Sequence, residues 1–164
     1  MFFALWPDAA TTANLVRATR GAVQHSGGRP CAKDQLHVTV AFLGGLTQMQ
    51  LEQALSTPPI AVGPFELSLD RLGFWRRSQV LWIAPRTVPS PLAELERRLW
   101  LALIERGFER EPQIYRPHLT LARRARPVEA SVTAVRWRVD DLTLVESTPT
   151  TRGAHYEVLH RWPL

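Results

Sequence analysis

The tetrapeptide His37-Val38-Thr39-Val40 is followed 81 residues later (118 − 37) by a near copy, His118-Leu119-Thr120-Leu121. Both read His-x-Thr-x with an apolar residue at x, which is typical of a half-buried β-strand because successive side chains point to opposite faces. Each histidine and its threonine are therefore expected on one face, with the apolar residues in the core. The spacing is about half the chain and predicts two related lobes, each presenting one imidazole.

Periodicity and turn residues predict the remaining elements. Strands are expected at Phe2–Trp6, Leu36–Leu43, Phe65–Asp70, Val80–Ile83, His118–Ala122, Arg136–Val139, Leu142–Val145 and Tyr156–Trp162. Helices are expected at Ala9–Val23, from a Thr47 cap to Leu55, and from a Ser90 N-cap to Gly107. Loops or turns are expected at Gly27–Pro30, Arg76–Ser78, Pro112–Pro117 and Thr148–Gly153. This order predicts an α+β fold: two pseudo-symmetric lobes with antiparallel sheets, a central cleft and helices packed outside.

The composition is that of an ordinary folded protein, with 164 residues, 45% hydrophobic and 21% charged. We expect a single domain over residues 1–164. No apolar run approaches the ~20 residues that a membrane-spanning helix needs, so no membrane partner is expected. The single cysteine, Cys31, excludes an intramolecular disulfide and fits a reducing cytoplasm, where we expect a loop or core thiol.

The net charge is +5, and all but one of the 20 basic residues are arginine, the exception being Lys33. Arginine forks match the geometry of phosphate oxygens, which favours a phosphate-bearing partner. An arginine-rich chain can equally reflect genome composition, so charge alone leaves both explanations open.

Two imidazoles that face one cleft suit general acid–base catalysis. The unperturbed pKa of histidine, ~6.5, allows one ring to accept a proton while the other donates one near neutral pH. Hydroxyls of Thr39 and Thr120 beside them can donate hydrogen bonds to an anion, and a phosphodiester fits such a site. Each motif offers a single ligand where zinc needs three or four, so no metal or other cofactor is expected. Neither a Gly-x-Ser-x-Gly elbow nor a Walker loop occurs. The other histidines, His25, His155 and His160, lack the motif and are expected to be structural or on the surface.

The sequence resembles the 2H phosphoesterase superfamily, and among its members the RNA 2′,3′-cyclic phosphodiesterases, also called 2′-5′ RNA ligases. The resembling segments, which run from end to end, are Phe2–Leu5, Gly28–Pro30, Leu36–Gly44, Arg116–Arg123 and Tyr156–Leu164. The resemblance implies metal-independent opening of an RNA 2′,3′-cyclic phosphate to a 2′-phosphomonoester, by a monomer that acts on RNA ends such as tRNA fragments. It also implies reversible 2′-5′ joining of RNA.

By the same resemblance His37 is the general acid, His118 is the base, and Thr39, Thr120 and Arg123 bind the phosphate. Strict strand alternation instead puts Arg124 on the face of His118, unless the strand ends or bulges near Ala122. Relatives often carry Arg-Tyr where this chain has His155-Tyr156, and Tyr156 is expected either to stack on a base or to pack. Phe42 is expected in the core, with a nucleobase contact as the alternative. The rival functions are a 2H phosphoesterase for small cyclic nucleotides or 2′-5′ oligonucleotides, and a non-catalytic RNA-binding module.

Overall fold

The computed structural model of the chain describes residues 1–112, 114–151 and 153–164. Gln113 and Arg152, which fall in the predicted loops Pro112–Pro117 and Thr148–Gly153, lie outside the described residues. The helices are α1 (Ala9–Ser26), α2 (Gln48–Leu55) and α3 (Ser90–Ile104), with a short 3₁₀ turn at Lys33–Gln35. The strands are β1 (Phe2–Leu5), β2 (Arg29–Pro30), β3 (Val38–Phe42), β4 (Phe65–Leu69), β5 (Arg71–Trp75), β6 (Val80–Ala84), β7 (Leu119–Arg123), β8 (Val135–Val139), β9 (Asp141–Thr150) and β10 (Gly153–Pro163).

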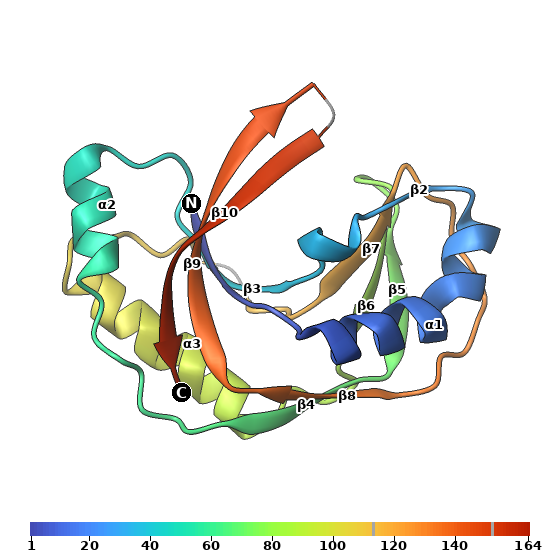
Figure 1. Ribbon diagram of the computed structural model, residues 1–164, viewed down its shortest axis with the longest axis horizontal. Coiled ribbons are helices and arrows are strands. Elements are labelled where there is room, and N and C mark those ends of the chain that lie inside the picture. The colour runs from blue at the N-terminus through green and yellow to red at the C-terminus, as the bar shows by residue number, and fades with distance from the viewer. Residues whose placement is uncertain (113, 152) are drawn as a thin grey trace.

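One antiparallel sheet, in the order β10-β9-β1-β3-β7-β6-β5, runs through both halves of the molecule (Figure 1). At its centre β3 and β7 pair only through Val38 and Leu119, so the two motif strands meet at one end and then diverge. We call β1, β3, β9 and β10 the first lobe, and β2, β5, β6 and β7 the second lobe. Strands β4 and β8 form a separate two-stranded sheet below them.

The helices lie on the outside, as the sequence predicted. Helix α3 contacts β3 and β4, and α1 contacts β7 and β8. The apolar stripe predicted on α3 is buried, including Leu92, Leu95, Leu99 and Leu103. Thr47 caps α2 as expected, with a reciprocal hydrogen bond to Gln50. The α+β architecture with antiparallel sheets is therefore confirmed.

The two motif strands carry the same irregularity. In β3, Phe3 of β1 pairs with Ala41 and Ala4 pairs with Thr39, so that Val40 is an extra residue. In β7, Leu81 of β6 pairs with Ala122 and Trp82 pairs with Thr120, so that Leu121 is extra. Two consecutive residues are buried in each strand, and the residue that follows is exposed. The fifth residue after each histidine is thereby returned to the face of that histidine.

Several local predictions were wrong. The turn or loop predicted at Thr148–Gly153 is shorter than expected, because β9 extends to Thr150 and β10 starts at Gly153, so a long hairpin projects from the first lobe (Figure 1). Ser90 is the first residue of α3 and not its N-cap, a position held by Pro89. Cross-strand pairing along the whole hairpin overrides the turn signal of its Thr, Pro and Gly residues.

The sequence did not predict β2 and β5, and a glycine lies at or next to each of these strands. Strand β5 contains Gly73, where a Cβ atom would come within 2.1 Å of the Trp82 ring on β6. Strand β2 follows Gly28, where a Cβ atom would lie 2.8 Å from Ala125. Glycine in a sequence usually argues against a strand, which is why both strands were missed. Here the absence of a side chain allows close packing against a neighbour.

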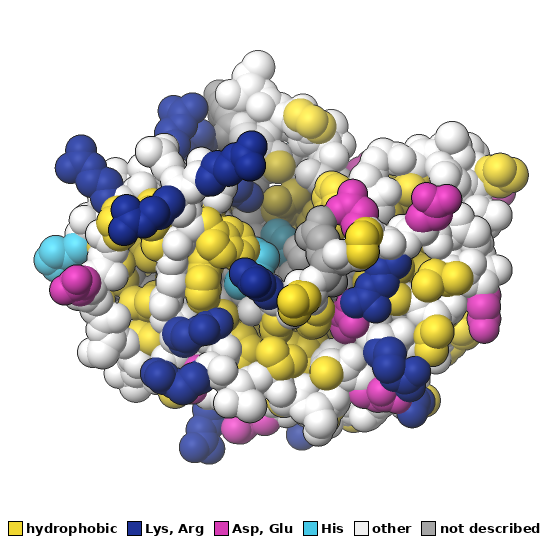
Figure 2. All heavy atoms as spheres, turned by 180° about the vertical axis from the view of Figure 1, so that it is seen from behind, with side chains coloured by type: hydrophobic (Ala, Val, Ile, Leu, Met, Phe, Trp, Pro, Cys, Tyr) yellow, Lys and Arg dark blue, Asp and Glu magenta, His cyan; other side chains and the backbone are white. Residues whose placement is uncertain are grey.

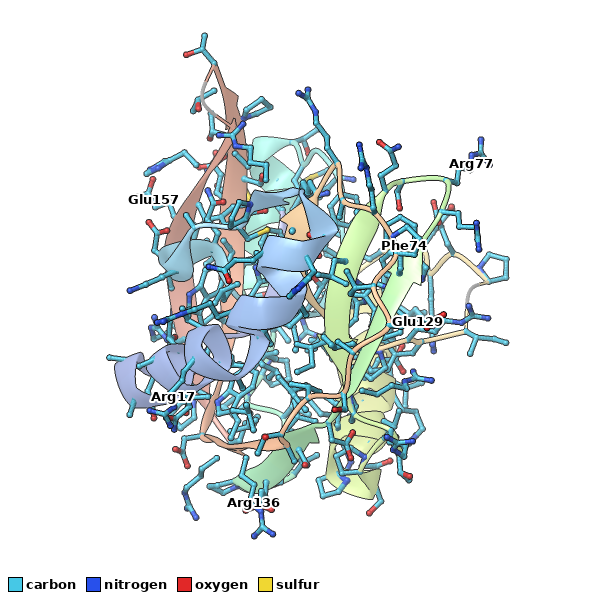
Figure 3. All side chains as sticks on the ribbon, turned by 90° about the vertical axis from the view of Figure 1, so that its right-hand side faces the viewer. Arg17, Phe74, Arg77, Glu129, Arg136 and Glu157 are labelled. Atoms are coloured by element: carbon cyan, nitrogen blue, oxygen red, sulfur yellow. The ribbon has the colours of Figure 1, made fainter. Side chains whose placement is uncertain are left out.

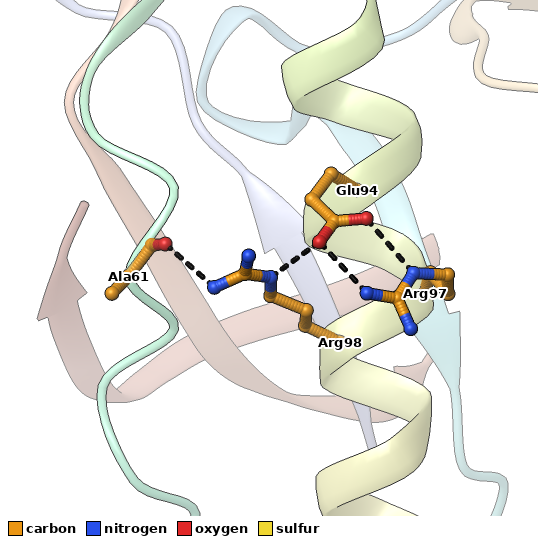
Figure 4. Close-up of polar contacts among 4 residues, drawn as sticks. All are labelled: Ala61, Glu94, Arg97 and Arg98. Atoms are coloured by element: carbon orange, nitrogen blue, oxygen red, sulfur yellow. Dashed lines mark hydrogen bonds and ion pairs between the residues drawn. The ribbon is translucent and has the colours of Figure 1, made fainter.

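On the outer surface, Glu94 of α3 binds Arg97 and Arg98 (Figure 4). Arg98 also donates to the carbonyl of Ala61 at 3.0 Å, which ties the segment after α2 to this helix. Among the described residues, no helix is both long and apolar enough to cross a membrane.

Candidate active site

A cleft of about 800 Å³ lies between the two lobes and contains every site residue predicted from the sequence. Its lining comprises Phe2, Arg29, Pro30, Cys31, Ala32, Gln35, His37, Thr39, Phe42, His118, Thr120, Arg123, Ser147, Gly153, Ala154 and Tyr156. In the space-filling view, histidine side chains lie inside a hollow between the lobes (Figure 2). Residues 81 positions apart thus share one site because β3 and β7 meet at the centre of the sheet.

The two histidines are held by matching hydrogen bonds. His37 Nδ1 lies 2.7 Å from the carbonyl oxygen of Gln35, and His118 Nδ1 lies 2.8 Å from that of Arg116. A carbonyl oxygen only accepts, so each Nδ1 carries a proton. Each Nε2 is then the nitrogen left to face the cleft, and it accepts a proton when the ring is neutral and donates one when the ring is charged.

Aromatic rings enclose His37. Its ring stacks on Phe2 (4.9 Å between centroids) and on Trp6 (5.0 Å), and it meets Tyr156 edge-on (5.3 Å). This burial lowers the pKa of His37 to about 4, against the upward effect of its bond to Gln35. Positive charge on His118 and Arg123 contributes to the same lowering of the pKa.

His118 has a more open environment. It packs against the edge of Trp75 at 4.4 Å between ring centroids, and Trp75 packs on Trp82. Burial lowers the pKa of His118, and the charge of Arg123 adds to this effect, while the hydrogen bond to Arg116 opposes it. Because the Trp82 ring lies over Gly73, that glycine supports the ring stack behind His118.

Thr39 and Thr120 lie on the same strand faces as the two histidines and line the cleft, as the alternation predicted. Neither hydroxyl hydrogen-bonds to another residue in the described part of the chain. Both remain available to donate to an anion bound between the lobes.

Arg123 lines the cleft and Arg124 does not. The extra residue Leu121 reverses the strand alternation, so that Arg123 follows His118 on one face. Arg124 then adopts a left-handed conformation, φ 53°, which ends the strand. The alternative that strict alternation offered is therefore wrong.

Phe42 was expected in the core, but its side chain is 69% exposed and lines the cleft. It occupies in β3 the place that Arg123 occupies in β7, so the same bulge exposes it. Cys31 also lines the cleft, and burial raises the pKa of its thiol.

Tyr156 packs on Phe2, Trp6 and the His37 ring, with one side on the cleft. These neighbours come from strands far apart in the chain, and no motif connects them.

The three histidines without the motif lie outside the cleft. His25 binds the Gly21 carbonyl on the surface of α1, His155 is exposed, and His160 packs on Trp162. Within residues 1–112, 114–151 and 153–164, no group of three or more His, Cys, Asp or Glu side chains is arranged to hold a metal ion.

The comparisons with known proteins agree with this geometry. The family model of the 2′-5′ RNA ligase superfamily matches residues 6–150. The chain belongs to this superfamily. A relative from Escherichia coli K12, named RNA 2′,3′-cyclic phosphodiesterase, is 32% identical over the whole of this chain and 96% of its own length.

The chain is also similar to solved structures over almost its whole length. A crystal structure of a phosphoesterase has a TM-score of 0.87 at 30% identity, over 99% of this chain and 96% of its own. Escherichia coli LigT complexed with 3′-AMP has a TM-score of 0.85 at 31% identity, with the same coverage. The family that the sequence resembled is confirmed, together with its fold.

Proposed function

We propose that this protein hydrolyses RNA 2′,3′-cyclic phosphate ends to 2′-phosphomonoesters without a metal ion. The observation that carries this proposal is the pair of imidazoles in one cleft, each fixed through Nδ1 to a backbone carbonyl, with Arg123 between the lobes. The E. coli relative is named for this activity, which supports the proposal. The enzyme class is a phosphodiesterase of the hydrolase type.

In the proposed reaction, His118 Nε2 accepts a proton from water as the water oxygen attacks phosphorus. The bond between phosphorus and O3′ breaks, and His37 Nε2–H donates its proton to O3′. Thr39, Thr120 and Arg123 bind the non-bridging oxygens, whose charge grows in the transition state. One proton is taken and one is given, so the pair ends in the reversed state and returns through solvent. An RNA 5′-hydroxyl that attacks in place of water forms a 2′-5′ linkage, which matches ligation by the same site.

His37 can act as the general acid only if its ring is protonated when the substrate is bound. A pKa of about 4 keeps His37 neutral in the free protein at neutral pH. A bound phosphodiester places a negative charge beside it and offsets the repulsion from Arg123, which raises that pKa. The proposed mechanism requires that this rise charges the His37 ring in the complex, where its proton is needed.

The exposed ring of Phe42 supports a nucleotide over a bare phosphodiester as the substrate. Phe42 of β3 and Arg123 of β7 both line the cleft, so the two lobes offer an aromatic face and a cation. Stacking of a base on an aromatic side chain contributes ~1–3 kcal/mol and tolerates any base. The crystallised complex of LigT with 3′-AMP is consistent with a nucleoside in this fold.

We infer a monomer, because both histidines come from one chain and the cleft is complete within it. The natural substrates are RNA ends with cyclic phosphates, including tRNA fragments, and the compartment is the cytoplasm.

The test uses an RNA oligonucleotide that ends in a 2′,3′-cyclic phosphate, incubated in chelator, with the product end identified by phosphorus NMR. We expect a 2′-phosphate. A panel with small cyclic nucleotides and 2′-5′ oligonucleotides separates the alternative substrates, and binding without turnover of any substrate would favour a non-catalytic RNA-binding module.

A second substrate tests which of the two histidines protonates the leaving group. Sulfur in place of bridging O3′ gives a thiolate leaving group, which needs no proton. This substrate should restore turnover to His37→Ala and leave His118→Ala inactive. The opposite pattern would exchange the two roles.

A further inference from the structure

The second lobe carries exposed arginines beyond the cleft that the proposed reaction does not use. Arg76 and Arg77 lie in the turn between β5 and β6, and Arg124 and Arg126 follow β7. We call these four residues the arginine rim. In the space-filling view, Lys and Arg side chains gather on the second-lobe side of the hollow that holds the histidines (Figure 2).

Backbone hydrogen bonds bring the two parts of the arginine rim together. The amide of Ala125 donates to the carbonyl of Gln79 at 3.0 Å, which joins the segment after β7 to the β5–β6 turn. The amide of Arg126 donates to the carbonyl of Ser26 at 2.9 Å, next to β2. Arg29 of β2 pairs with Arg123 of β7, and both line the cleft. Positive charge is therefore continuous from the phosphate site to the arginine rim.

The arginine rim has no acidic partner in the part of the chain that the structure describes. None of its four members forms a salt bridge with another residue in the described ranges, whereas arginines elsewhere do. Residues 71–86 and 116–126 contain eight arginines and no acidic residue. Unpaired guanidinium groups beside a phosphate site fit a polyanion better than a neutral partner.

The side of the molecule that carries the first lobe differs in charge from the second lobe. The segment from Gly44 to Gly63, which includes α2, contains Glu52 and no basic residue. Strand β10 presents Glu157 on the side of the molecule away from Arg77 (Figure 3). Among the described residues, the cluster of arginines without an acidic partner lies over the second lobe, where a chain of phosphates that leaves the cleft meets positive charge.

We propose that the arginine rim binds the phosphate backbone of the RNA that precedes the terminal cyclic phosphate, so that an RNA end is bound more tightly than a free nucleotide. This inference rests on the proposed function and adds the path of the polymer. Backbone contacts of this kind are independent of sequence and salt-dependent, because each neutralised phosphate releases counterions.

The test compares two double variants, Arg76→Gln with Arg77→Gln, and Arg124→Gln with Arg126→Gln. The matched control is Arg136→Gln with Arg138→Gln, which removes the same charge from β8. Arg136 lies at the other end of the molecule from Arg77 (Figure 3). Both control arginines form only exposed ion pairs, with Glu66 and Asp140, so their loss costs little stability.

Two substrates separate the arginine rim from the cleft: a nucleoside 2′,3′-cyclic phosphate and an RNA decamer with the same end. For each rim variant we expect KM for the decamer to rise roughly five- to thirty-fold, with kcat for both substrates and KM for the mononucleotide unchanged. The control variant should match the wild type with both substrates.

A binding measurement is independent of turnover. Fluorescence anisotropy with a labelled decamer that ends in a 2′-phosphate should show the same weakening. The slope of log Kd against log salt should fall by about 0.7 for each RNA phosphate that a rim variant no longer neutralises, measured between roughly 50 and 200 mM salt. Equal KM values for decamer and mononucleotide in the wild type, or equal effects of rim and control variants, would overturn the inference. Failure of the proposed function would instead appear as no hydrolysis of either substrate.

Discussion

At the scale of single residues, His37 and its aromatic neighbours couple the site to folding. The pKa of His37 is about 4 in the folded protein and ~6.5 in an unfolded chain, so between these values the unfolded chain binds more protons. The contribution of the neutral His37 ring to the free energy of unfolding is complete above about pH 6.5 and is lost as the pH falls to about 4. His37→Gln removes this titration.

We therefore expect the free energy of unfolding of the wild type to fall more steeply between pH 7 and pH 4 than that of His37→Gln. The difference should be about 1–3 kcal/mol, since each unit of pKa corresponds to about 1.4 kcal/mol. Urea unfolding at several pH values measures it. Parallel curves for the two proteins would show that His37 is not desolvated in the folded state.

The histidines and threonines should differ in the size of their effects. Proton transfer by a positioned group contributes ~10²–10⁴-fold, so His37→Ala and His118→Ala should each lower the single-turnover rate by about that factor. Thr39→Ala or Thr120→Ala should cost less, up to ~10²-fold. The double histidine variant should be little worse than either single one, because both rings act in one transition state.

His25→Ala, on the exposed surface of α1, is the control for this series, and thermal melts show whether each variant folds. A folded His118→Ala variant with nearly wild-type turnover would contradict the proposed acid–base pair.

At the scale of elements, the divergence of β3 and β7 leaves few links between the two motif strands. One of them is Tyr115, whose hydroxyl donates to the carbonyl of Thr39 at 3.2 Å from the loop that leads into β7. This bond fixes the approach to His118 against the strand of His37. It therefore helps to set the distance between the two imidazoles.

Tyr115→Phe removes the hydroxyl without leaving a cavity. We expect a loss of about 1 kcal/mol in the free energy of unfolding and a fall in kcat of up to ~10²-fold, because small displacements of catalytic groups are costly. The matched control is Thr143→Val, which removes a buried hydroxyl bonded to the Ala4 carbonyl at 2.8 Å within the first lobe. Equal kcat values in the two variants would show that Tyr115 stabilises the fold without positioning the site.

At the scale of the whole molecule, one cluster of buried side chains extends through both lobes and includes Phe3, Leu69, Leu81 and Leu119. Lobes that share a core should unfold together. Such cooperative unfolding is what the single domain expected from the chain length predicts. Tryptophan fluorescence and far-UV circular dichroism should give coincident urea transitions. Two separated transitions would mean that each lobe is an independent folding unit.

The proposed reaction also predicts a response to metal removal, because both protons are moved by imidazoles. Turnover of a cyclic-phosphate RNA should be unchanged after dialysis against EDTA and unchanged by added magnesium or manganese. Activity that disappears in EDTA and returns with a divalent ion would replace the two-histidine scheme by metal-assisted hydrolysis.

Local sequence patterns were sufficient to predict the motif strands, the family and the candidate site. The period of two in His37–Val40 and His118–Leu121 predicted which side chains face the cleft, because alternation is a local property of an extended backbone. The Thr47 cap of α2 and the apolar stripe of α3 could also be predicted, since each depends on residues that lie close together in the sequence.

Other features depend on pairing between strands far apart in the chain, and they became visible only in the folded molecule. The extra residues Val40 and Leu121 appear only when β3 and β7 pair with their neighbours, and they decide that Phe42 is exposed and that Arg123 lines the cleft. The low pKa of His37 likewise comes from rings that meet it only in the folded sheet, such as that of Trp6. Local patterns predicted that the two histidines and two threonines face the cleft, whereas contacts between distant segments decided the positions of Phe42 and Arg123 and the charge state of His37.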